Sequence, residues 1–244
     1  MFDMSKKQSV VKSLLAIGIM ISAALASTAM AQEVRYSWVD MSYMQQNADI
    51  AGTQATPVAG QTVDVNGVHG NGIRFRGSAG TWHNLYMFVD FASTDMDVFA
   101  VVNNAGGAFP ANDEFDFTTL RAGLGLRFPI GLGPATDLYA ELTYDSIDLD
   151  FGSFAGENFD TENKDIGGAL GIRAMLNDNI ELRAYGRYTN HADVNLSSGE
   201  FDAAAVYGAG FGWQIVRGFS IVGDFESGEF GSWSVGFRLD LDED

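Results

Sequence analysis

The stretch "NIELRAYGRYT", from Asn179 to Thr189, decides the fold. Its residues alternate in character, as they do in a β-strand whose two faces meet different surroundings. Positions 180, 182, 184, 186 and 188 are apolar, small or aromatic, and the other face carries Glu181, Arg183, Tyr185 and Arg187. In a soluble sandwich the charged face would lie outside, whereas in a membrane barrel it would line the interior. The placement of this face therefore separates two classes of protein.

Alternating segments recur along the chain, and most exceed the about 5–6 residues that are usual for soluble strands. They are expected at 34–45, 72–81, 84–93, 117–128, 137–148, 165–176, 179–190, 201–215, 218–226 and 232–241. Short turns alternate with long polar connections at 46–71, 94–116, 149–164 and 191–200. Outer-membrane barrels sort their turns and loops in this way. The pattern predicts an all-β, up-and-down antiparallel transmembrane β-barrel of ten strands, with eight strands as the alternative.

The composition of the two faces indicates which one meets lipid. One face is apolar and uncharged over several segments, with members such as Leu120, Leu124, Leu138, Leu142, Val235 and Phe237. The opposite face holds arginines and carboxylates but no lysine. An enclosed surface favours arginine, because its planar guanidinium can satisfy several acceptors at once. We therefore expect Arg183 and Arg187 to point into a lumen.

Turn positions also predict which charged residues face each other, because the turn fixes the register of an antiparallel hairpin. Directly opposed side chains are close enough for charge-assisted hydrogen bonds. The expected lumen ion pairs are Arg76 with Asp90, Arg121 with Asp145, Arg127 diagonally with Glu141, and Arg173 with Glu181. Such pairs would fill the interior and favour a plugged lumen over an open one.

Charge and composition exclude several function classes. The 244-residue chain has a formal net charge of −18, which argues against nucleic acid as a partner. It contains no cysteine, which excludes disulfides and thiolate zinc sites. Lysines before the apolar run 14–26, followed by "AMA" at 29–31, predict a signal peptide over 1–31 that is cleaved near Ala31. The barrel domain is then 32–244, and no cofactor is predicted.

The end of the chain carries a more specific pattern. In "SVGFRLDL", Ser234, Gly236, Leu239 and Leu241 occupy the marked positions of a motif that resembles the C-terminal insertion signal of bacterial outer-membrane barrels. From about Tyr36 to Leu241 the chain resembles the small outer-membrane β-barrels, the opacity and OmpA/OmpX-type proteins. The resemblance implies a monomer in the outer membrane of a Gram-negative cell, in contact with lipid and inserted by the barrel-assembly machinery. Ten strands instead of eight, and "DED" at 242–244, depart from the family pattern.

Two features offer candidate chemistry. His191, with Asp193 two residues on, is expected at the rim, where some barrels of this kind carry a catalytic histidine, but a polar loop is the simpler interpretation. The acidic stretches 145–150 and 157–165 flank one connection and could attract divalent cations. Lys164 occupies a ligand position and the closing glutamate is absent, so the calcium-loop pattern fails and no dedicated metal site is predicted.

These observations favour a structural, surface-facing barrel over an enzyme. The expected role is envelope integrity, adhesion or interaction through acidic extracellular loops. A narrow passive pore for ions or small solutes is the first alternative, because ten strands enclose slightly more space than the eight that side chains just fill. A rim enzyme involving His191 is the second, and a soluble periplasmic barrel is the third.

Overall fold

The computed structural model describes residues 34–48, 52–55, 62–80, 84–130, 135–154, 157–195, 200–228 and 230–241. Eleven strands are present in these ranges. They are β1 (Trp38–Ala48), β2 (Gly52–Ala55), β3 (Thr62–Gly80), β4 (Leu85–Asn104), β5 (Gly107–Pro129), β6 (Thr136–Phe154), β7 (Glu157–Asn177), β8 (Ile180–Asn195), β9 (Glu200–Val216), β10 (Phe219–Ser227) and β11 (Phe230–Asp240). Within these residues, no helix is long and apolar enough to cross a membrane.

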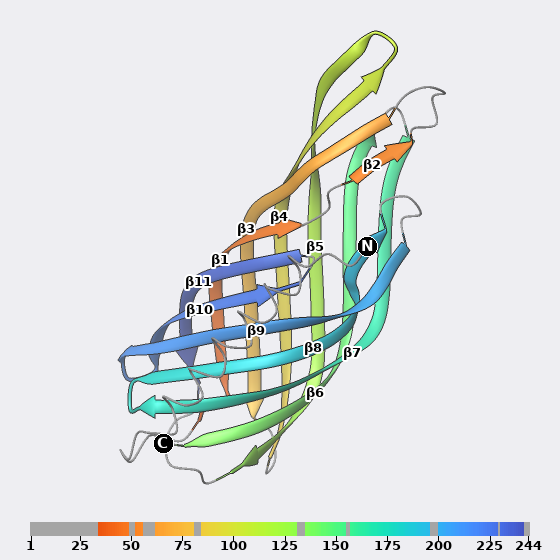
Figure 1. Ribbon diagram of the computed structural model, residues 1–244. Helices are drawn as coiled ribbons and strands as arrows, with labels where there is room; N and C mark the ends of the chain where they lie inside the picture. The colour runs from red at the N-terminus through yellow and green to blue at the C-terminus, as the bar shows by residue number, and fades with distance from the viewer. Residues whose placement is uncertain are drawn as a thin grey trace, which may run out of the picture.

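The sheet closes on itself through its first strand (Figure 1). Strand β1 pairs along its whole length with β11 on one side and with β3 on the other, and all neighbours are antiparallel. Among the described residues, the short strand β2 pairs only with β3, above the closed part. The wall therefore consists of β1 and β3–β11, which confirms the predicted ten-stranded antiparallel barrel.

The strand faces are also as predicted. The apolar set is exposed on the outside, with Leu142 at 64%, Leu124 at 52% and Phe237 at 58% exposure. The residues between them point into the barrel, where Arg173 and Glu181 are almost fully buried. The charged face of the stretch 179–189 therefore lies inside.

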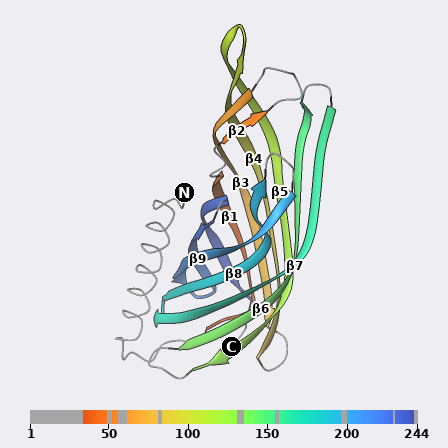
Figure 2. The same cartoon turned by 45° about the vertical axis from the view of Figure 1, so that its right-hand side comes forward.

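The four long connections are shorter than predicted, because the strands continue through much of them. Strands β4 and β5 run up to a turn at Ala105 and Gly106, and Gly107 has a φ of 128°, a backbone conformation that favours glycine. Strands β6 and β7 continue to residues 154 and 157. These hairpins rise above the barrel in Figures 1 and 2, and we call this the long-hairpin end and the opposite end the short-turn end.

Within these extensions the polarity of the two strand faces is reversed. At the long-hairpin end the inward residues are apolar and form the mouth cluster, made of Ala48, Val68, Met96, Phe115, Phe117 and Ile147. Many of the outward residues are acidic, and these form the acidic ladder, made of Asp95, Asp97, Glu114, Asp116 and Asp148. On β5 the change falls between Thr118 and Leu120. Scanning for an uncharged outer face misses these segments, because there the apolar face is the inner one.

Candidate functional site

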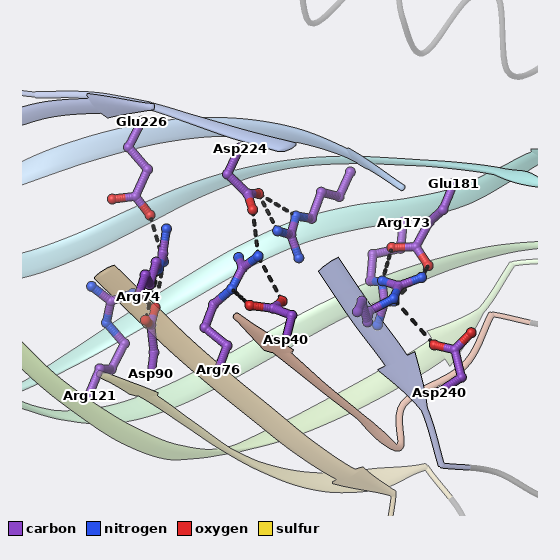
Figure 3. A network of polar contacts seen from close by, with 12 residues as sticks. Asp40, Arg74, Arg76, Asp90, Arg121, Arg173, Glu181, Asp224, Glu226 and Asp240 are labelled. Carbon is purple, nitrogen blue, oxygen red and sulfur yellow. Dashed lines mark hydrogen bonds and ion pairs between the residues drawn. The ribbon is translucent and has the colours of Figure 1, made fainter. Parts of the chain in front are cut away.

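The interior below the mouth cluster is filled by arginines and carboxylates from nearly every strand (Figure 3). Strand alternation places them, because each lies on the inward face of its strand. The buried charged members, which we call the ion-pair network, are Asp40, Arg74, Arg76, Asp90, Asp145, Arg173, Glu181, Arg187, Asp224, Glu226 and Arg238, joined by the less buried Arg121 and Arg183. Because both signs are interleaved in this small space, most of the guanidinium groups contact a carboxylate closely.

The rung nearest the short-turn end centres on Glu181. Its carboxylate lies 2.8 Å from Nη2 of Arg173 and 3.1 Å from Nη2 of Arg238. The expected register was wrong here, because Arg173 lies opposite Arg183 and Glu181 lies opposite Met175. The displacement is two residues, so both side chains keep their inward face, and arginine is long enough to reach its partner diagonally.

The middle rung joins strands that are far apart in the chain. Nη2 of Arg76 lies 2.8 Å from Asp40 on β1 and 2.6 Å from Asp224 on β10, and Arg183 also contacts Asp224. Arg76 does lie opposite Asp90 in the β3–β4 register, but its guanidinium donates hydrogen bonds to Asp40 and Asp224. The expected Arg76–Asp90 bond is therefore corrected. This guanidinium instead binds Asp40, directly opposite it on β1, and Asp224, which lies three strands away around the barrel on β10.

The upper rung centres on Asp90 and Asp145. Nε of Arg74 donates to Asp90 over 2.8 Å. Arg121 lies opposite Asp145, as the turn at 129–136 requires, and its Nε donates to that carboxylate over 3.1 Å. Thr189 also donates to Asp145, over 3.0 Å. Arg187 has a longer contact, 3.4 Å from its Nη2 to Glu226.

The expected pair of Arg127 and Glu141 does not form as proposed. The two residues lie one diagonal step apart, but Nη1 of Arg127 is 3.9 Å from Asp137, the other diagonal neighbour. Glu141 accepts a hydrogen bond of 2.8 Å from the hydroxyl of Tyr86. Both diagonal positions carry a carboxylate, so register alone could not choose between them.

Three inward tyrosines lie against glycines of the neighbouring strand, a feature that the sequence reasoning missed. Gly125, Gly171 and Gly208 stand opposite Tyr86, Tyr139 and Tyr185, respectively. A Cβ atom on any of these glycines would overlap the facing ring. The sequence does contain a signal for these contacts, because alignment of the strands in the correct registers places each of these tyrosines opposite a glycine. The rings occupy lumen space that the charged groups leave.

Apolar groups also close the short-turn end. Val34, Tyr36, Tyr86 and Met175 form the base cluster, with Val34 and Tyr36 almost fully buried. The guanidinium carbon of Arg173 lies 4.6 Å from the ring centre of Tyr36, within the range of a cation–π contact. The ion-pair network is thus bounded by the base cluster below and the mouth cluster above.

The four residues of the terminal motif lie on β11 and just after it. Ser234 and Gly236 face inward, while Leu239 and Leu241 are exposed on the outside. Gly236 stands opposite Ser42 at the β1–β11 pairing, where any Cβ atom would overlap the β1 backbone. This position needs glycine because the barrel closes there.

Several predicted features fall outside what the structure describes. The expected signal peptide 1–31 and the residues 242–244 lie outside the described residues. The backbone of His191 and Asp193 belongs to β8, but their side chains are not described. Among the side chains that are described, no group of three or more histidine, aspartate or glutamate residues is arranged to hold a metal ion.

Comparison with protein families assigns this chain to a family. The sequence profile of the outer membrane protein beta-barrel domain matches residues 13–214. The chain belongs to this family. Its exposed apolar belt is accordingly the surface that meets lipid, and the ion-pair network lies inside the membrane-spanning wall.

Solved structures of other barrels are similar in fold. OprG from Pseudomonas aeruginosa is 11% identical over 87% of this chain and 100% of its own, with a TM-score of 0.44. The translocator domain of the autotransporter NalP from Neisseria meningitidis is 13% identical over 96% of this chain and 98% of its own, with a TM-score of 0.48. The Ail protein of Yersinia pestis is 13% identical over 85% and 100%, with a TM-score of 0.36. Comparison with curated protein sequences gives no match.

Proposed function

We propose that this protein is a structural barrel of the outer membrane whose lumen is closed and whose long hairpins act at the cell surface. Its role is envelope integrity, adhesion or interaction, with no enzymatic step. One observation carries the proposal: the ion-pair network is enclosed between two apolar clusters. In this proposal the mature chain begins after Ala31, is inserted by the assembly machinery and works as a monomer.

The network opposes passage of solutes in two ways. Its charges are already paired at short range, so a passing ion gains little from them and would have to separate partners such as Arg76 and Asp224, 2.6 Å apart. The mouth cluster adds an apolar layer, with Met96 fully buried. An ion would have to shed water to cross that layer, which costs several kcal/mol per ion as an order of magnitude.

The long hairpins supply the proposed interaction surface. Register places Asp97 opposite Glu114, and Asp116 opposite both Asp95 and Asp150. Directly opposed like charges are destabilising, so a cationic partner would relieve them. We propose that divalent cations, shared with phosphorylated lipid headgroups of the outer leaflet, occupy this surface diffusely.

Single-channel recording of the purified, refolded protein in a planar lipid bilayer tests the closed lumen. We expect no resolved conductance steps from the wild-type barrel. A variant with Met96→Ala and Phe117→Ala opens the mouth cluster but leaves the ion-pair network intact. Because the network still fills the lumen, we expect this variant to show conductance steps rarely or not at all. Steady conductance of the wild-type protein would refute the closed lumen.

A narrow pore is the second candidate, and one observation favours it. Cavities of about 70 and 90 Å³ lie above and below the upper rung and share Arg74, Asp90, Arg121 and Arg187. Separation of those four side chains would connect the two cavities. If the barrel is a pore, wild-type channels should open, and Asp90→Asn should shift their selectivity towards anions.

A further inference from the structure

We infer that the upper cavity of the lumen is a binding site for a short-chain aliphatic carboxylate, held by Arg187. The cavity, of about 70 Å³, lies between the upper rung and the mouth cluster. This inference goes beyond the proposed structural role, and it holds whether the lumen is closed or conducting, because binding requires only that the ligand reach the cavity from one side.

Arg187 differs from the other buried arginines of the network. Its residue is 9% exposed, yet its Nε and Nη1 have no hydrogen-bond partner. Its Nη2 donates to Glu226 over a long 3.4 Å, whereas Arg74 donates to Asp90 over 2.8 Å. A buried guanidinium with unmet donors is costly, which suggests that an acceptor from outside the chain completes it.

Register explains why the chain itself leaves these donors unmet. Arg187 stands opposite Ala169 on β7 and Val206 on β9, so neither neighbouring strand offers a carboxylate. Arg121, by contrast, stands opposite both Asp90 and Asp145. Nε and Nη1 do not lie on one shared edge of the guanidinium group, but each can donate a hydrogen bond to a carboxylate oxygen.

The rest of the cavity wall defines the other half of the ligand. Its upper side is apolar, with Phe117, Ile147 and Phe230, and Val206 lies beside Arg187. The lower side carries three arginines and three carboxylates, and among these described side chains Arg187 is the arginine with donors left unmet. Unmet guanidinium donors below an apolar wall fit a ligand with an anionic head and an aliphatic body. The volume is about half of the roughly 150 Å³ of an apolar cavity that holds benzene, so a ligand of the size of propionate fits better than an aromatic acid.

The wall beside this cavity offers a route of entry. Among the described residues, the β7–β8 pairing ends at Gly168 and Tyr188, directly after Arg187. The β8–β9 pairing is interrupted between Thr189 and Asp193, where β8 carries extra residues. The wall is therefore least continuous beside Arg187 and Thr189.

Binding of ¹³C-labelled propionate to the refolded barrel in detergent micelles, followed by NMR titration, tests the inference. We expect saturable binding that weakens about tenfold or more in Arg187→Met, because hydrogen bonds to a charged group are lost. Ile147→Phe, which fills the apolar side without changing any charge, should weaken binding similarly. Lys164→Gln, which removes an exposed positive charge outside the lumen, should leave the affinity unchanged.

Two competitors separate the parts of the proposed recognition. Propionamide has the same shape without the charge, and inorganic phosphate has charge without the aliphatic body, so both should compete poorly. Equal competition by either, absence of saturable binding to the wild-type barrel, or undiminished binding to Arg187→Met would overturn the inference. The heat-dependent electrophoretic mobility of each variant shows that it is folded, so a loss of binding is not a loss of the barrel.

Discussion

The two halves of strand β5 follow the same alternation with opposite chemistry. From Leu120 towards the short-turn end, apolar residues face outward and charged ones such as Arg121 face inward. Beyond Thr118, Glu114 and Asp116 face outward while Phe115 and Phe117 are buried inside. No register shift separates the halves in the β5–β6 pairing. The backbone therefore continues unchanged, and only the surroundings differ: lipid outside the lower half and water outside the upper half.

This contrast locates the edge of the hydrocarbon on neighbouring strands. Leu120 stands opposite Phe91 on β4 and Ser146 on β6, and the next outward residues beyond them on each strand are polar or acidic. The lower half buries its charges because its exterior must be apolar. The upper half buries its apolar groups, as a soluble sheet does. The predictions below test this division, from the largest expected effect to the smallest.

The largest effect is expected inside the lower half. Glu181→Gln removes the carboxylate that lies between Arg173 and Arg238 and should cost about 3–5 kcal/mol, since two buried guanidinium groups lose this carboxylate and Arg238 keeps only its contact to Asp240 among the described carboxylates. The free energy of unfolding in urea, measured in lipid vesicles, gives this value. Asp97→Asn, a matched removal of a carboxylate from the outer face of the upper half, should change it little. Equal costs would mean that the network is not desolvated.

The outer face of β6 gives a comparison within one strand. Leu142→Arg places a charge in the lipid belt and should cost about 2–4 kcal/mol, because the guanidinium must leave water. Asp148→Arg lies on the same face six residues further along, above the proposed membrane edge. It should cost almost nothing in the same unfolding measurement. A similar cost at both positions would place the membrane edge beyond Asp148.

Two methionines compare the inner and outer apolar surfaces. Met96 is fully buried in the mouth cluster, whereas Met87 is 49% exposed on the belt. Met96→Ala should destabilise the barrel by about 2–3 kcal/mol, because it leaves a cavity that its neighbours cannot fill. Met87→Ala should cost less than half as much, since lipid chains fill the space. The order of the two values decides whether the mouth cluster is packed like a protein core.

The smallest effect is expected on the acidic ladder. Asp116 stands opposite Asp95 and Asp150, so Asp116→Asn removes like-charge repulsion and should stabilise the hairpins by about 0.2–1 kcal/mol. Millimolar magnesium should raise the stability of the wild-type protein more than that of the variant. Unfolding with and without magnesium measures both. A gain that is independent of magnesium would argue against cation binding on this surface.

Local sequence patterns predicted the parts of this fold that depend on alternation. The faces of Leu142 and Arg187 follow from parity, which survives a register error of two residues. That is why Arg173 and Glu181 remain in contact although the register around the β7–β8 turn was misjudged. The partners of Arg76 could not be predicted from the short turns. Asp40 faces it in the pairing of β1 with β3, which are separated by β2 in the chain, and Asp224 lies on β10.

The extensions above the membrane escaped prediction for a different reason. Strands were expected to have an apolar outer face, whereas "DEFDF" at 113–117 has an apolar inner face. Its alternation is as regular as that of the wall. Allowing the two faces to exchange chemistry along one strand would have assigned these residues to β5. The unmet donors of Arg187 likewise depend on Ala169 and Val206, whose positions required the true registers on both sides.

The pairing of β1 with both β3 and β11 makes the wall a ring with a seam. At this seam the amide of Leu241 donates to the carbonyl of Ser37 over 2.8 Å, so the first and last strands meet at the short-turn end. In a ring the place where the chain starts is arbitrary. A circular permutant that links these ends and opens the exposed tip at Ala105 and Gly106 would keep every rung of the ion-pair network. It would also move the terminal motif of β11 into the middle of the chain, and thereby separate what that strand does for closure from what it does for insertion.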